Sequence, residues 1–157
     1  MSLTKAFHDH DFNIKWINEG GASAFESLYT QQYYNKNYFK SGQNRVNIAV
    51  VNKPEIFESY RRSGKEDSNY SSSVFMVLAL VKELKKLDFT EEKAFKLILN
   101  DYWRKNPSNY NWKKVFQEVF NISLENFYKS LKNYTNDIER IFCSYKIGQA
   151  QYSFAHE

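Results

Sequence analysis

The 157-residue sequence contains little of what stabilises disulfide-rich or turn-rich domains: one cysteine, two prolines and five glycines. The lone Cys143 excludes an intrachain disulfide and a zinc site built from several cysteines, and we expect it to be a small buried core residue. So few glycines and prolines favour long helices over a β fold with many turns. The longest apolar run, 74–81, is far shorter than the ~20 residues that cross a bilayer, so no transmembrane segment is predicted.

The excess of one sign of charge is small, because 22 Lys and Arg are balanced by 18 Asp and Glu, which leaves a net charge of +4. The longest basic clusters, Arg61-Arg62 and Lys85-Lys86, are too short to follow a phosphate backbone, which argues against nucleic acid as a partner. No basic segment followed by an apolar one opens the sequence, so no signal peptide is predicted. The cellular compartment and the oligomeric state are not predicted.

Aromatic residues are abundant, with twelve Tyr and thirteen Phe. We therefore expect a core built from large rings, in which many hydroxyl groups need a hydrogen-bond partner. The length is that of one domain with a substantial core. We predict an N-terminal arm over 1–15, a single helical domain over 16–147 and a C-terminal tail over 148–157.

Apolar residues recur at spacings of three and four along most of the chain, which is the period of an α-helix. Thr90 and Ser123 are placed to cap two of the helices at their N-termini. The β-branched segment 46–51 suggests a short strand, but it has no partner strand, and a helical turn is equally expected. We predict an all-α fold: a compact bundle of about six helices, with at most one short extended segment near 46–51. The expected helices cover 19–34, 54–60, 69–87, 90–106, 112–120 and 123–145.

The most specific motif is the run Trp16-Ile17-Asn18-Glu19-Gly20-Gly21-Ala22, followed by Glu26. It resembles the W-x-N-E-G-x-A-x-x-x-E signature of gluzincin zinc metallopeptidases, the group that includes aminopeptidase N-like enzymes. The resemblance implies that Glu19, early in a helix, is the counterpart of a zinc ligand. Trp16 would pack as an apolar wall just before that helix, and the small residues would let two helices approach closely. In the simpler interpretation, Glu19 is an acid favoured by the helix dipole alone.

Two weaker correspondences follow along the chain. In the same family a later helix opens with Y-x-K-G, and its Tyr hydroxyl helps to stabilise the oxyanion of the tetrahedral intermediate. Tyr70 stands at that place here, with Ser72 and Ser73 instead of Lys and Gly; the alternative is a Tyr that only packs at a helix start. The segment 115–127 resembles a helix-turn-helix of bacterial peptidase-like domains, with Asn121 at the left-handed turn.

The family's other zinc ligands are absent, because the sequence contains no H-E-x-x-H helix with its two histidines and its general base. His8-Asp9-His10 has the wrong spacing and no Glu base. On an extended segment, however, His8 and His10 would lie on one side, and with Glu19 they would form a substitute zinc site. The simpler interpretation is a pair of solvated histidines in the arm.

Two hypotheses for the function follow. The chain is either a truncated or degenerate zinc-metallopeptidase-like domain, for which we expect no peptidase activity alone, or a non-enzymatic helical module that binds a protein or peptide. In an intact enzyme zinc would be the cofactor and a peptide or protein the substrate. An exposed aromatic groove without convergent ionisable groups would favour the binding module.

Overall fold

The computed structural model describes residues 14–36, 46–60 and 68–134 of the chain. Within these ranges the secondary structure is helical and no strand occurs, which confirms the predicted all-α class. His8, His10, Cys143 and the predicted helical residues beyond 134 lie outside the described residues. Across the described ranges, none of the helices combines the length and apolarity that crossing a bilayer requires.

The helices lie close to their predicted positions, although several are shorter or are divided. The segment predicted as one helix before Pro107 begins as an α-helix, continues through one π-helical stretch and ends as a short α-helix. In chain order the elements are α2 (Lys15–Tyr34), α4 (Ala49–Asn52), η2 (Pro54–Glu58), α5 (Ser68–Lys86), α6 (Glu91–Lys96), η3 (Leu97–Asp101), α7 (Tyr102–Arg104), α8 (Trp112–Phe120), α9 (Leu124–Ser130) and η4 (Leu131–Tyr134).

Local side-chain chemistry sets the ends of these helices. Thr90 Oγ1 accepts a hydrogen bond from the Lys93 backbone N–H at 3.2 Å, so the predicted cap of α6 is confirmed. Ser123 Oγ caps α9 in the same way. Asn121 ends α8 in the left-handed conformation with φ 55°, as predicted for the turn between the two helices.

Segment 46–51 adopts the helical alternative, because it leads into α4 and pairs with no strand in the described chain. Asn47 Oδ1 accepts from the Ala49 N–H at 3.0 Å and begins the turn. Ser72 of α5 accepts from the Asn47 N–H at 2.8 Å. These two bonds satisfy backbone donors that an isolated strand would have left unpaired.

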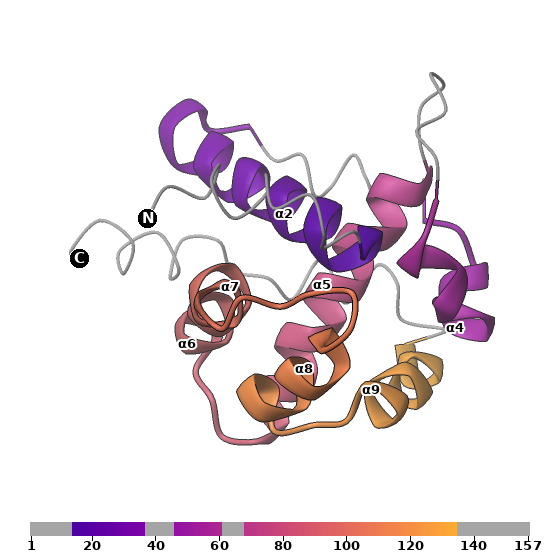
Figure 1. The fold of residues 1–157 in the computed structure, drawn as a ribbon. Coiled ribbons are helices and arrows are strands. Elements are labelled where there is room, and N and C mark those ends of the chain that lie inside the picture. Colours follow the sequence, from indigo (N-terminus) through magenta and orange to yellow (C-terminus); the bar gives the residue numbers. More distant parts are fainter. Residues whose placement is uncertain (1–13, 37–45, 61–67, 135–157) are drawn as a thin grey trace.

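Helix α5 is the central element of the fold, and its residues from Ser72 to Val81 are all buried. Figure 1 shows it passing behind α2 and α8 through the middle of the molecule. The most extensive contact between any two elements is the one between α2 and α5. The predicted core helix is therefore confirmed, and α2 is the helix that covers most of it.

The α2–α5 contact is close because Gly20 has no side chain. A Cβ atom at this position would overlap the backbone carbonyl group of Ser73 and lie 2.9 Å from Val77 Cγ2. The carbonyl belongs to a packed helix and cannot move aside cheaply. The small-residue requirement inferred from the sequence therefore holds at Gly20, whereas a Cβ on Gly21 would make only an ordinary contact, 3.9 Å from Leu99 Cδ2.

Trp16 lies inside the first turn of α2, not before the helix as the motif suggested, because α2 begins at Lys15. Its indole is fully buried. The ring meets Phe127 at a centroid distance of 5.5 Å and Phe116 edge to face at 6.1 Å. Its Nε1–H donates to the Tyr128 hydroxyl at 3.0 Å, across 112 residues of sequence. One side chain thereby joins the start of α2 to α8 and α9.

We predict that Gly20→Ala lowers the free energy of unfolding by about 1–3 kcal/mol, because the new methyl group overpacks the contact with α5. Gly21→Ala is the matched control, since it adds the same atoms one residue further along α2. We expect it to raise stability by up to about 1 kcal/mol through the better helix propensity of alanine. Urea unfolding of the two variants measures both effects, and a Gly20→Ala protein as stable as the parent would contradict the close approach.

Candidate functional site

Glu19, the counterpart of a zinc ligand by resemblance, lies on the second turn of α2 and is already paired. Its Oε1 is 3.8 Å from Lys15 Nζ, and its side chain is 21% exposed. A pair of this kind, one turn apart on a helix surface, contributes only about 0.3–0.5 kcal/mol. The first turn of α2 contains no acid, so the contact that the structure shows for Glu19 is the ion pair with Lys15.

Tyr70 lies in the first turn of α5 and is partly exposed. Its ring meets Tyr60 edge to face, with the centroids 6.2 Å apart. Glu19 and Tyr70 are therefore on two helices that touch at Gly20 and Ser73, but their own contacts are with Lys15 and Tyr60. The backbone brings the two elements together without joining the two side chains.

The serines that replace the family's Lys and Gly have structural contacts. Ser72 Oγ donates to the Ser68 carbonyl at 2.5 Å while it accepts from the start of α4. Ser73 Oγ donates to the Asn69 carbonyl at 2.7 Å and lies 3.0 Å from the Tyr60 hydroxyl. Both side chains thus tie α5 to the segment that precedes it.

A zinc site cannot be assembled from the residues that the structure describes. None of them form a group of three His, Cys, Asp or Glu side chains that could hold a metal ion. His8 and His10, the other members of the predicted substitute site, lie outside the described ranges. Glu19 is thus the only predicted metal ligand within those ranges, and we derive no metal-dependent step from it.

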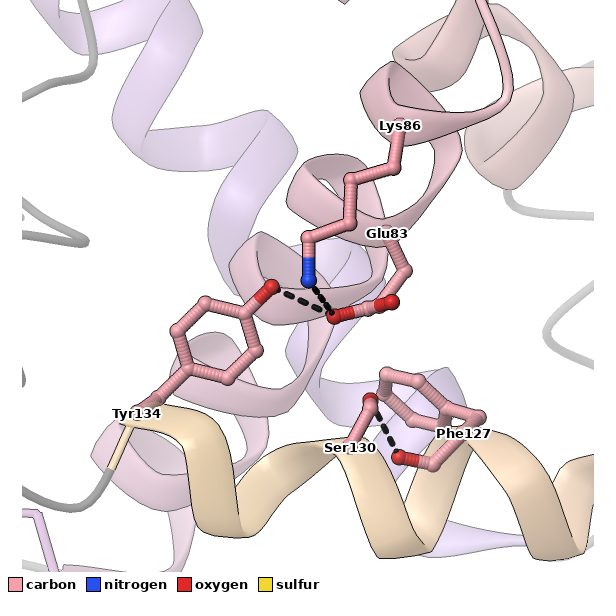
Figure 2. A network of polar contacts seen from close by, with 5 residues as sticks. All are labelled: Glu83, Lys86, Phe127, Ser130 and Tyr134. Carbon is pink, nitrogen blue, oxygen red and sulfur yellow. Dashed lines mark hydrogen bonds and ion pairs between the residues drawn. The ribbon is translucent and has the colours of Figure 1, made fainter.

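A buried carboxylate that the sequence did not single out belongs to Glu83 of α5 (Figure 2). Its Oε1 accepts from the Tyr134 hydroxyl at 2.6 Å and from Lys86 Nζ at 2.8 Å. Burial, followed by the hydrogen bond and charge of Glu83, raises the pKa of Tyr134 above its ordinary value. Two donors satisfy the acid, so this network fastens η4 to α5 and leaves no group poised for proton transfer.

A second buried network extends from Trp16. The Tyr128 hydroxyl accepts from the indole and donates to Glu58 Oε1 at 2.9 Å. Burial raises the pKa of Tyr128 most, and the neighbouring Glu58 charge raises it further. The hydroxyl therefore stays protonated and acts as a structural bridge between α2, α9 and η2.

Exposed aromatic rings lie on the C-terminal half of α2. A pocket of about 260 Å³ opens there, and its described lining residues all belong to this helix. We call this the α2 aromatic surface, and it consists of Phe25, Leu28, Tyr29, Gln32 and Tyr33. Among the described residues that line the pocket there is no acid, lysine, arginine or histidine, so this lining has the composition of a contact surface and not of an acid–base site.

The rings of this surface are unusually open to solvent. The exposed fractions are 37% for Phe25, 48% for Tyr29 and 61% for Tyr33, and the adjoining Tyr34 is 65% exposed. Tyr29 and Tyr33 contact each other with centroids 4.5 Å apart, so they form a cluster on the surface.

The spacing of apolar residues predicts this helix but does not show which of its faces is buried. The face of α2 that packs on the core consists of Trp16, Ile17, Gly20, Gly21, Ala24, Ser27 and Leu28. Phe25, Tyr29 and Tyr33 follow a separate row at spacings of four, which runs beside the buried one. This second row is the signal that would have revealed the surface.

Comparison with protein-family models, with curated proteins and with solved structures gives no match for this chain.

The buried tyrosines make stability depend on alkaline pH. Burial raises the pKa of Tyr102, Tyr128 and Tyr134 above the ordinary value of 10.0. Their contribution is complete below that value and is lost as pH rises above it, because the unfolded chain ionises and the folded one does not. We predict a loss of about 1.4 kcal/mol per pH unit for each tyrosine above about pH 10.

Urea unfolding at a series of pH values measures this slope, and Tyr102→Phe is expected to reduce it by about one third. Ionisation of all twelve tyrosines while helical circular dichroism persists would contradict the prediction.

Proposed function

We propose that this chain is a non-enzymatic helical module that binds a peptide or protein partner through the α2 aromatic surface. The observation that supports this most is the cluster of exposed rings around a pocket on α2, whose described lining residues include no charged group. Tyrosine gives a large contact area at a low cost in side-chain entropy and is enriched in binding interfaces.

The size of the pocket limits what enters it. Pockets that enclose drug-sized ligands occupy roughly 300–1,000 Å³, and this one measures about 260 Å³. It therefore fits one side chain of a partner, with the surrounding rings covering the partner's neighbouring residues. An anchor side chain in a small pocket, rimmed by aromatic contacts, is the arrangement expected of a peptide-binding surface.

The N-terminal half of α2 gives this surface a rigid support. Trp16 and Gly20 fix the helix against α8, α9 and α5, so the aromatic rows project from a helix that cannot rotate freely. A preorganised surface loses less entropy when a partner binds, which improves affinity for a given contact area.

A second candidate is the degenerate zinc-metallopeptidase-like domain. The packing of Gly20 on Ser73 favours it, because the resemblance implies that the small residues of the motif let the ligand-bearing helix approach another helix closely. In this proposal Glu19 is a former or incomplete zinc ligand and Tyr70 a former oxyanion donor. Any zinc would need His8, His10 or ligands outside this chain.

Selection from a random peptide display library tests the first proposal. We predict that enriched peptides bind the parent chain and lose about ten-fold or more in affinity when Tyr29→Ser and Tyr33→Ser are combined, since two aromatic contacts are removed. Tyr110→Ser is the matched control, because Tyr110 is 99% exposed and lies outside the surface. Peptides that bind the parent and the double variant equally would contradict the proposal.

Zinc titration separates the two candidates. If His8, His10 and Glu19 form the substitute zinc site, the purified chain binds stoichiometric zinc and Glu19→Gln weakens that binding. If the chain is a binding module only, we expect Glu19→Gln to leave peptide affinity unchanged, because Glu19 is a surface acid paired with Lys15.

A further inference from the structure

We propose that the partner of the α2 aromatic surface is a peptide segment that stacks an arginine side chain on the exposed tyrosine rings and pairs it with Glu26. This inference rests on the proposed function and specifies the chemistry of its ligand. Its basis is the charge on the C-terminal half of α2 and the absence of lysine and arginine from that half.

The tyrosine rings are the first element of the argument. Tyr29 lies between two others, with its ring centroid 4.5 Å from that of Tyr33 and 6.5 Å from that of Tyr34. The faces of such rings carry the negative part of the ring quadrupole and attract cations. A guanidinium group is planar and weakly hydrated, so it stacks on these faces better than an ammonium group.

Elsewhere in the described chain, the protein supplies such cations itself. Lys86 lies over the Tyr134 ring at 5.4 Å, Lys93 over Phe89 at 5.3 Å and Lys113 over Trp112 at 5.6 Å. From Trp16 to Tyr34, however, α2 contains no lysine or arginine. Lys36 follows the helix and is exposed. Within the described residues, its ammonium group does not lie over an aromatic ring. The α2 rings therefore present faces that a partner's cation would cover.

Glu26 supplies the second element. It is exposed, and it precedes Tyr29 and Tyr33 by three and seven residues, so all three lie along one side of the helix. The Thr30 hydroxyl donates to the Glu26 backbone carbonyl at 2.7 Å and not to its carboxylate. The other acid of α2, Glu19, is paired with Lys15; among the described ion pairs none uses Glu26.

The end of the helix supplies the third element. The last turn of α2 contains no basic residue, and its one backbone cap is the Asn35 N–H, which donates to the Gln31 carbonyl at 3.2 Å. The C-terminus of a helix carries about half a negative charge. From Phe25 to Tyr34, α2 thus combines exposed rings with one acid, Glu26, and no basic residue. Acid, ring faces and helix dipole all favour the same ligand, a cation on a flexible stem.

Two synthetic peptides test the inference directly: acetyl-Gly-Leu-Gly-Arg-Gly-Leu-Gly-amide and its counterpart with neutral citrulline in place of arginine. We expect the arginine peptide to shift the backbone amide resonances of residues 25–34 in a ¹H–¹⁵N titration. The citrulline peptide should bind at least about three-fold more weakly, which is the size expected of a cation–ring contact at an exposed site. Added salt should reduce the difference.

Variants of the full chain complete the test. Glu26→Gln is expected to weaken arginine-peptide binding about three-fold and to leave citrulline-peptide binding unchanged. Glu92→Gln removes the same charge from an exposed position of α6 and should change neither.

Equal affinity of the two peptides for α2 would overturn the arginine inference while leaving the proposed peptide-binding surface intact. If neither peptide binds while display-selected peptides without a cation do, or if the surface is instead covered by a second copy of the chain, the inference is also overturned. If no peptide of any kind binds at α2, the proposed function itself fails.

Discussion

The fold depends on the hydrogen bond that the Trp16 indole donates to the Tyr128 hydroxyl. An indole N–H is a donor only, so a buried tryptophan in this position needs an acceptor. The Tyr128 hydroxyl accepts this hydrogen bond and donates its own to the Glu58 carboxylate, so both groups are satisfied. Around this bond the rings of Phe116 and Phe127 close on the indole. The start of α2 is thereby fixed to elements that lie more than a hundred residues further along the chain.

The same helix has two different halves as a consequence. Its buried residues lie between Trp16 and Leu28, and Gly20 lets its backbone lie directly on the Ser73 carbonyl group. A second row of residues, Phe25, Tyr29 and Tyr33, faces solvent and lines a pocket. The anchored half supplies rigidity, and the other half carries the surface that we propose to bind a partner. The W-x-N-E-G motif therefore has a clear role in packing, because Trp16 and Gly20 are both explained by contacts, whereas Glu19 is engaged only by Lys15.

The sequence predicted the helical class, the helix positions and the caps at Thr90, Ser123 and Asn121, because these features depend on local periodicity and on single side-chain–backbone bonds. It did not predict which face of α2 is buried. Two apolar rows run along that helix, and only the tertiary partners of Trp16 and Gly20 decide between them. The Glu83 network was missed for the same reason, since its Tyr134 partner is 51 residues away. The predicted histidines lie outside the described residues, so the zinc hypothesis stays a prediction.

The most direct test of this account is a double-mutant cycle on Trp16 and Tyr128, measured by urea unfolding. Trp16→Phe removes the indole donor and Tyr128→Phe removes the hydroxyl acceptor, while each keeps an aromatic ring in the core. If their hydrogen bond anchors α2, the two substitutions are coupled by about 1 kcal/mol or more, since each alone already breaks the same bond. Effects that add within about 0.3 kcal/mol would show that the two residues act independently and would contradict the account.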